Sequence, residues 1–282
     1  MKYYVLFNPL SANGNGKEKV SALPEKLTDG ELEYVDVTQH PDVRGLLTEI
    51  SADDTIVLCG GDGTVNRFIN DLRGVDIQQK ILYYPCGSGN DFAREVQKDG
   101  GFVELNQYMK NLPVATVNGK EWLFVNGVGF GIDGYCCEVG DKVRAEKPNT
   151  KIDYTAIAIK GVLFHYKPTN ATVIVDGVEH KFKKVWIAPT MKGWYYGGGI
   201  NPSPAQDRND PDGKVSLTLF YGTNRIKTLM IFPNLFKGTH VKYKKAFAFF
   251  TGKEITVKFD APRALQVDGE TVLGVTEYTV KA

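Results

Sequence analysis

The chain has 282 residues, 42% of them hydrophobic, which is enough to bury a sizeable core in one large domain or in the two that we expect. Its 34 Lys and Arg nearly balance its 33 Asp and Glu, so the overall charge does not indicate a nucleic-acid partner. The four cysteines include no CxxC pair, no apolar run approaches the roughly 18 residues of a membrane span, and no signal-peptide pattern precedes the first strand. We therefore expect a cytoplasmic protein with reduced thiols.

The first 110 residues alternate apolar runs with helical patterns. Strands are predicted at 3–7, 33–37 and 56–59, and helices near 17–27 and 43–50. This alternation is typical of βαβ units and predicts a Rossmann-like parallel sheet.

After Pro113 the pattern changes to one that is typical of antiparallel β structure. The dipeptides Asn118-Gly119 and Asp176-Gly177 predict two hairpins. Further strands are expected at 215–221, 246–250, 255–259, 264–267 and 278–280, with helices near 152–164 and 226–236. We predict an α/β domain over residues 1–120 and a mostly antiparallel β-sandwich over residues 121–282, with a C-terminal tail that is able to pack back on the first domain.

Residues 55–72 contain the most informative motif, a short apolar run that leads through Gly-Gly-Asp-Gly-Thr into a helix. The glycines allow close approach of a ligand, Thr64 can cap the helix, and free N–H groups at a helix start favour an anion. Asp62 would repel a phosphate unless a cation such as Mg²⁺ lies between them. The motif therefore predicts a metal-bound nucleotide, with Asp62 holding or orienting the metal.

Two more glycine-rich loops, at 8–16 and 85–91, also follow predicted parallel strands. The carboxyl ends of parallel strands meet at one edge of an open sheet, so the three loops should converge there. None of them matches the GxxxxGK[ST] pattern of an ordinary P-loop. A GxGxxG run at 129–134 follows a strand of the β-rich half without a clear βαβ context, and we interpret it as a tight structural turn.

These motifs resemble, in order and spacing, the bacterial diacylglycerol kinase and sphingosine kinase type of lipid kinase. The resemblance depends on NPLSANGNG at 8–16, GGDGTVN at 60–66, PCGSGNDFAR at 85–94, YYGGG with Pro202 at 195–202, and VDGE at 267–270. It covers essentially the whole chain. It implies an N-terminal nucleotide domain, a C-terminal β-sandwich, and phosphorylation of a lipid hydroxyl by ATP in a cleft between them.

The resemblance also implies roles for individual residues. Glu270 takes the position of the catalytic base, with Asp268 beside it. The contacts to ATP fall on Asn8, Pro9, Leu10, Ser11, Ala12, Thr38, Gly61, Asp62, Gly63, Thr64, Val65, Asn66, Arg67 and Ser88.

A structural Mg²⁺ site of some family members maps onto the Asp212 carboxylate and the carbonyls of Asn209 and Lys214. Three positions depart from the family pattern. Val215-Ser216 stand where Leu-Asp is usual, and Arg67 replaces a usual glutamate.

The chemistry is coherent on the residues alone, because phosphoryl transfer requires positioning and charge neutralisation more than covalent participation. Asp91 can share the metal with Asp62, and Arg94 can neutralise phosphate charge or pair with Asp91 on the same helix. Glu270 would accept the proton of the acceptor hydroxyl late in transfer. Each role has a structural alternative: the glycine loops can be plain turns, Glu270 an exposed hairpin carboxylate, and Asp212 ordinary turn sequence.

We predict an ATP- and Mg²⁺-dependent lipid kinase that meets its lipid substrate at the membrane surface. The sequence does not fix its oligomeric state, for which a homodimer is one candidate. One alternative is a kinase of soluble substrates in the manner of NAD kinase. Another is a nucleotide-binding regulator without turnover, for which Arg67 and positions 215–216 are the hints. The lysine-rich segment 237–245 can contact anionic lipid, although we favour a solvated strand face.

Overall fold

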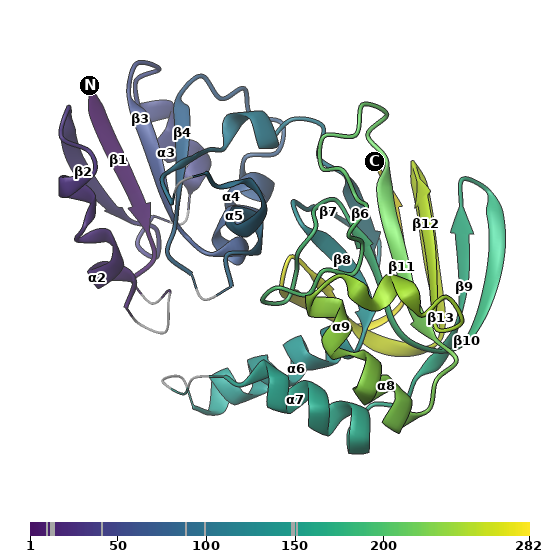
Figure 1. Ribbon diagram of the computed structural model, residues 1–282. Coiled ribbons are helices and arrows are strands. Elements are labelled where there is room, and N and C mark those ends of the chain that lie inside the picture. Colours follow the sequence, from purple (N-terminus) through teal and green to yellow (C-terminus); the bar gives the residue numbers. More distant parts are fainter. Residues whose placement is uncertain are drawn as a thin grey trace. The chain divides into compact units, whose positions relative to one another are not determined.

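The computed structural model describes residues 1–282 except 10, 12–14, 41, 88, 99, 148–149 and 151. The chain divides into two compact units, residues 1–110 and 111–282 (Figure 1). This boundary is earlier than the predicted one at 120, because the strand at 114–117 pairs with the C-terminal strand of the second unit. Within the described ranges, no helix has both the length and the apolar character needed to cross a membrane.

The first unit is built on a five-stranded sheet in the order β2-β1-β3-β4-β5. Its first four strands are parallel and only β5 is antiparallel, which confirms the predicted α/β domain. The strands are β1 (Lys2–Phe7), β2 (Glu31–Asp36), β3 (Thr55–Gly60), β4 (Lys80–Pro85) and β5 (Val103–Glu104). Every residue of β3 is buried, as expected for a central parallel strand that reads as a continuous apolar run.

The helices of this unit are short. They are α2 (Gly16–Val20), α3 (Val43–Glu49), α4 (Asp62–Asp71) and α5 (Asp91–Val96), with 3₁₀ turns η1 (Leu23–Glu25) and η2 (Asn106–Tyr108). The helix expected near 17–27 is therefore interrupted, since Pro24 lacks the N–H that a continuing helix requires. In α4 the predicted apolar stripe of Val65, Phe68, Ile69 and Leu72 is buried.

The loops that follow β3 and β4 pack against each other through glycine. The carbonyl oxygen of Gly60 accepts hydrogen bonds from the backbone N–H groups of Cys86 and Gly87, at 2.9 and 3.1 Å, and from the Tyr83 hydroxyl at 3.2 Å. A Cβ atom on Gly87 would lie only 2.3 Å from the Cα atom of Gly61. The two loops can approach this closely only because neither position carries a side chain.

The second unit contains a nine-stranded antiparallel sheet in the described part of the chain, which confirms the predicted change of architecture. The strands are β6 (Val114–Val117), β7 (Lys120–Leu123), β8 (Gly127–Gly131), β9 (Thr169–Val175), β10 (Val178–Met191), β11 (Val215–Tyr221), β12 (Phe247–Gly252), β13 (Glu254–Val267) and β14 (Glu270–Lys281). Strand β9 pairs with both β10 and β13, and β8 also pairs with both. These four strands form a closed ring around an apolar core.

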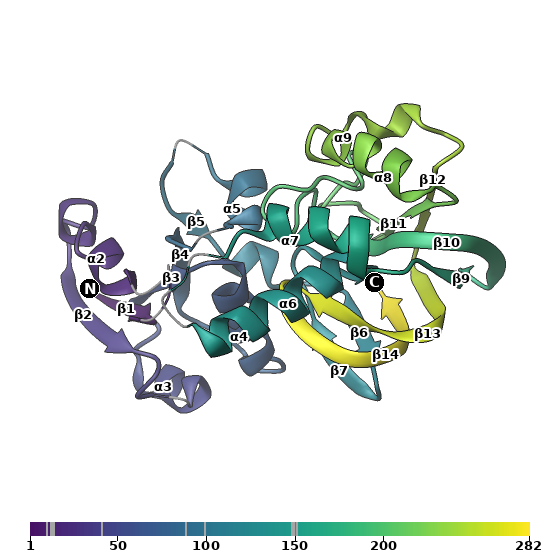
Figure 2. The same cartoon turned by 90° about the horizontal axis from the view of Figure 1, so that it is seen from below.

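The helices of the second unit are α6 (Ile132–Glu146), α7 (Tyr154–Lys160), α8 (Arg225–Ile231) and α9 (Pro233–Phe236), with the π-helix η3 (Gly161–His165) and the 3₁₀ turn η4 (Thr239–Lys242). Figures 1 and 2 show α8 and α9 side by side. The segment 237–245 contains η4 and precedes β12, so the expectation of a strand face there was wrong.

Helix α6 was not predicted, because its glycines lower intrinsic helix propensity. Both glycines of α6, Gly134 and Gly140, are required by the packing of the helix against its neighbours. A Cβ on Gly134 would lie 2.1 Å from the carbonyl oxygen of Ala264, and one on Gly140 would lie 2.8 Å from the ring of Tyr154. The GxGxxG run therefore joins β8 to α6, yet the neighbours of β8 are antiparallel, so it is not the βαβ dinucleotide fingerprint.

Asp268 fixes the turn between β13 and β14. Asp268 and Gly269 have φ of 46° and 93° and form the two-residue loop that connects paired Val267 and Glu270. The buried carboxylate of Asp268 accepts hydrogen bonds from three successive backbone N–H groups, at residues 125–127, over 2.7–2.9 Å. The turn that presents Glu270 is thus tied to the segment leading into β8.

The substitution Gly87→Ala should disrupt the contact between the two glycine loops, because its Cβ would meet the backbone of Gly61. We expect a loss of about 1–3 kcal/mol in the stability of the first unit, the usual size of overpacking effects. Amide hydrogen exchange of peptides from residues 1–110 measures it. Gly101→Ala is the matched control, since its Cβ would meet only the Lys98 carbonyl oxygen at 3.9 Å. Equal protection in the two variants would contradict the contact.

The substitution Asp268→Asn should destabilise the second unit by about 2–3 kcal/mol, because the side-chain NH₂ group would face backbone donors. All three tryptophans belong to this unit, so denaturant unfolding followed by fluorescence reports its stability. Asp176→Asn is the control, since Asp176 also has φ of 46° and one oxygen accepts both of its bonds, from Lys253 and Glu254. A midpoint for Asp268→Asn that matches the control would refute this role.

Candidate functional site

The loops after β1, β3 and β4 leave the same edge of the parallel sheet, because these strands are parallel neighbours. After β1, Ser11 donates its N–H to the carbonyl oxygen of Asn8 at 3.0 Å, and Pro9 lies between them. Gly16 packs on the same carbonyl, where a Cβ would lie at 2.2 Å. The predicted ATP contacts Leu10, Ala12 and Ser88 lie outside the described residues.

Thr38, another predicted ATP contact, follows β2 at the edge strand of the sheet. Its N–H and hydroxyl both donate to one carboxylate oxygen of Asp36, at 2.9 and 2.7 Å. The side chain is exposed, so it remains accessible to a ligand at the carboxyl edge.

The loop after β3 opens directly into α4, whose N-cap is Gly61 and whose first residue is Asp62. Thr64 lies inside the first turn, so the prediction that it caps the helix was wrong. Its side chain instead packs over Gly60, where a Cβ would lie 2.2 Å from the Thr64 hydroxyl oxygen. With Gly63 as its second residue, the start of α4 presents backbone N–H groups rather than bulky side chains.

Of the other α4 residues that were predicted to contact ATP, some lie in the core and one lies on the surface. Val65 and Asn66 are buried, and the amide of Asn70 donates to the carbonyl and side-chain oxygens of Asn66 at 2.9 and 3.2 Å. Arg67 points to the exposed side of the helix. The pKa of Asp71 is raised by burial, and the charges of Arg67 and Arg44 partly offset this rise.

Asp62 joins α4 to α5. Its two carboxylate oxygens accept hydrogen bonds from the backbone N–H groups of Asp91 and Phe92, each at 2.8 Å, so it caps α5 from another element. Asp91 is buried, and the Arg94 guanidinium lies 4.0 Å from its carboxylate. The structure therefore brings together the three charged residues that were predicted to handle phosphate and metal.

The carboxylates of Asp62 and Asp91 are hard oxygen donors of the kind that Mg²⁺ prefers, and a carboxylate oxygen that accepts one amide bond retains a second lone pair. The described residues contain no group of three or more His, Cys, Asp or Glu side chains that could hold a metal alone. The donor set fits a cation that completes its coordination with phosphate oxygens and water.

The residues of the predicted structural Mg²⁺ site, Asn209, Asp212 and Lys214, contact other groups of the protein in this structure. The exposed carboxylate of Asp212 lies 2.7 Å from the ammonium of Lys214, and the Lys214 carbonyl accepts a hydrogen bond from the Gln206 side chain at 3.1 Å. Asp210 organises the turn by accepting from the N–H groups of Asp212 and Lys214. Asn209 lies in the same turn. A metal at this position stays a prediction, and it would have to displace the ammonium group.

Glu270 is the first residue of β14 and is partly buried. The Asp268 carboxylate is engaged by backbone amides, which gives this residue a positioning role at the turn before Glu270. On the other side, the hydroxyl of Thr271 donates to Asp141 of α6 at 2.6 Å. The backbone on both sides of the predicted base is therefore fixed.

Two buried cations beside this turn were missed by the sequence analysis. The Arg208 guanidinium donates to the carbonyl of Val125 at 2.5 Å and to the side chain of Asn126 at 3.2 Å. The N–H of Lys192 donates to the Asn126 carbonyl at 2.8 Å. Burial, and then the charge of Arg208, lowers the pKa of Lys192. No local pattern marks these residues, since their contacts span more than 60 positions of the chain.

A buried polar cluster was also missed. Neither carboxylate oxygen of Asp133 nor the hydroxyl of Tyr196 has a hydrogen-bond partner of good geometry among the described residues. Burial raises the pKa of Asp133 to about 6, although backbone amides and the nearby Gln266 and Tyr196 side chains work against the rise. The YYGGG motif at 195–199 thus supplies the buried Tyr196 to this cluster.

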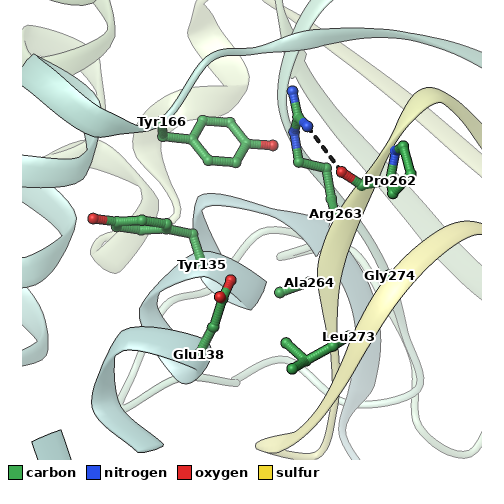
Figure 3. A pocket seen from close by; sticks show the side chains of 8 residues that line it. All are labelled: Tyr135, Glu138, Tyr166, Pro262, Arg263, Ala264, Leu273 and Gly274. Carbon is green, nitrogen blue, oxygen red and sulfur yellow. Dashed lines mark hydrogen bonds between the residues drawn. The ribbon is translucent and has the colours of Figure 1, made fainter. Parts of the chain in front are cut away.

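The second unit also has a surface pocket of about 300 Å³ between α6 and the β13–β14 hairpin (Figure 3). Its walls are Tyr135, Glu138, Tyr166, Pro262, Arg263, Ala264, Leu273 and Gly274. The Arg263 guanidinium lies 5.8 Å from the centre of the Tyr166 ring and donates to the Pro262 carbonyl. None of the predicted site residues lines this pocket.

Two family models match the chain in sequence. The family described as the diacylglycerol kinase catalytic domain matches residues 2–116, and the YegS C-terminal NAD kinase beta sandwich-like domain matches residues 126–281. A diacylglycerol kinase of Mycobacterium tuberculosis is 28% identical over 254 residues, which cover 86% of this chain and 80% of that protein. A diacylglycerol kinase of Bacillus subtilis is 23% identical over 282 residues, which cover 94% and 88%.

The fold is shared with a diacylglycerol kinase from Bacillus anthracis, whose crystal structure matches with a TM-score of 0.60 at 18% identity over 99% of this chain and 92% of that one. The two family matches follow the order of the two units and together cover nearly the whole chain. The chain therefore belongs to the family that carries the YegS C-terminal NAD kinase beta sandwich-like domain, and its residues 2–116 match the diacylglycerol kinase catalytic domain.

Proposed function

We propose that this chain transfers the γ-phosphoryl group of ATP to a hydroxyl group of a lipid such as diacylglycerol. The observation that carries the proposal is the pair of glycine loops after β3 and β4, held together at the carboxyl edge of the sheet by Asp62, in a chain that matches the diacylglycerol kinase catalytic domain. The names of its relatives, diacylglycerol kinases, support a lipid acceptor.

Nucleotide binding is assigned to the first unit. The glycines let phosphate oxygens approach the backbone, and the start of α4 offers N–H groups and the positive end of the helix dipole. Arg94, whose side chain is 47% exposed, can add positive charge while it remains near Asp91. Such positioning and charge stabilisation account for most of the catalysis that phosphoryl transfer requires.

Mg²⁺ bound with the nucleotide would neutralise negative charge on the phosphate oxygens, and Asp62 and Asp91 are the residues that would hold it. Because Asp62 also caps α5, its removal would disturb the fold of the loops as well as the metal. An Asp62→Ala variant would therefore lose the cap of α5 together with any metal ligand, so its activity alone does not test the metal role.

Proton transfer is assigned to Glu270 of the second unit, which would accept the proton of the acceptor hydroxyl as the phosphoryl group arrives. Asp268 positions this carboxylate through the turn. Lys192 and Arg208 would add positive potential near the same turn, where negative charge gathers during transfer.

One observation favours a second candidate, a kinase of soluble acceptors, because the C-terminal family is described as NAD kinase beta sandwich-like. A direct assay separates the candidates. With ATP labelled at the γ position and Mg²⁺, we expect the label to move to a lipid from a total extract dispersed in detergent micelles, and not to NAD, sugars or nucleosides. Labelling of NAD without lipid would favour the second candidate, and ATP binding without any transfer would indicate a regulator.

The substitution Glu270→Gln keeps the shape of the side chain but removes its basicity. We expect kcat to fall by roughly 10² or more while the affinity for ATP changes little, since a base acts only as the proton is transferred. Glu277→Gln is the matched control, because Glu277 is exposed on the same strand and pairs with Lys258 at 2.7 Å. Unchanged kinetics in the Glu270 variant would leave this residue as an ordinary hairpin carboxylate.

A further inference from the structure

Two adjoining helical elements of the second unit expose long apolar side chains. Phe164 in η3 and Ile226 and Met230 in α8 expose 70%, 71% and 73% of their surface. Ile226 and Met230 are one turn apart on the same face of α8. The two elements touch, and the Arg225 side chain at the start of α8 donates a hydrogen bond to the Val162 carbonyl in η3. We call Phe164, Ile226 and Met230 the apolar ridge.

The segments that contain these elements carry Lys and Arg but no Asp or Glu. Residues 215–253 contain seven Lys and Arg but no Asp or Glu, and residues 154–175 contain two lysines and again no Asp or Glu. Lys160 in α7, Lys227 in α8 and Lys237 after α9 are exposed. Because the whole chain has a net charge of only +1, the rest of it is net negative, so the positive charge is concentrated on this part of the second unit.

We propose that the apolar ridge and the lysines around it dock on the interfacial region of a lipid bilayer that contains anionic lipids. Single exposed apolar residues are common on protein surfaces, but two long side chains on one face of α8 and a third on the adjoining η3 concentrate exposed apolar area on this part of the second unit. Such side chains gain free energy when they enter the boundary between headgroups and acyl chains, and nearby lysines are attracted by anionic headgroups.

The charge also argues against a second copy of the chain as the occupant of this face. A two-fold interface would place the same patch on both sides and bring lysines toward lysines. A bilayer with anionic lipids supplies the opposite charge together with an apolar layer. The inference rests on the proposed function, which requires a lipid acceptor, and it identifies the surface of the second unit that meets the lipid.

Sedimentation of the full chain with vesicles tests the docking surface in the absence of ATP. The vesicles contain phosphatidylcholine alone or with about one third phosphatidylglycerol, to vary surface charge. We expect binding to the anionic vesicles that weakens as salt is added. The double substitution Ile226→Ser and Met230→Ser should weaken this binding roughly tenfold or more, because apolar area no longer enters the interface. Val178→Ser is the matched control, since Val178 is 58% exposed in the β9–β10 hairpin.

Binding by the double variant that equals wild type, or no binding of wild type to anionic vesicles, would overturn the docking surface. Concentration-dependent dimerisation that the double variant loses would assign the face to a second copy and would overturn it as well. Phosphorylation of a short-chain diacylglycerol in detergent micelles tests the proposed function separately. Turnover there without vesicle binding refutes only the docking surface, whereas absence of turnover both there and with the total lipid extract refutes the lipid-kinase function.

Discussion

The first unit depends on a carboxylate that accepts two backbone amides from a neighbouring helix. Asp62 begins α4 and caps α5, and beside it Gly61 and Gly87 allow the two loops to touch backbone to backbone. Charged acceptors make stronger hydrogen bonds than neutral ones, and the close approach excludes side chains from both positions. The result is a closely packed edge after β3 and β4, at which the start of α4 is the place where N–H groups favour an anion.

The second unit repeats this device at another acidic residue. Asp268 accepts three successive amides from the segment before β8, so the turn before Glu270 is fixed by a contact that spans more than 140 positions of the chain. A charged side chain is tolerated in a buried turn because each of these amides faces it. In both units a carboxylate that the sequence suggests as chemical is first of all a structural acceptor, and it fixes the backbone of a neighbouring segment.

Charged residues are distributed unevenly along the chain, although the numbers of positive and negative residues nearly cancel. The helical elements near the end of the second unit carry lysine without aspartate or glutamate, next to exposed apolar side chains. Elsewhere lysines on the surface commonly pair with glutamate, as Lys258 does with Glu277. Screened surface pairs of this kind contribute little to stability, whereas a cluster of like charges creates a local potential that a net charge of +1 conceals.

The sequence by itself determined the parallel sheet of the first unit, the change to antiparallel strands, and the glycine loops. These features can be predicted because hydrophobic periodicity, turn dipeptides and glycine spacing are local signals. It also indicated Asp62, Asp91 and Glu270 by motif. Only the tertiary structure decided that Thr64 packs over Gly60, that the glycines of α6 fit beside Ala264 and Tyr154, and that Asp268 anchors a turn. It alone placed Lys192 and Arg208 beside that turn. Each of these depends on contacts between distant segments, which no local pattern encodes.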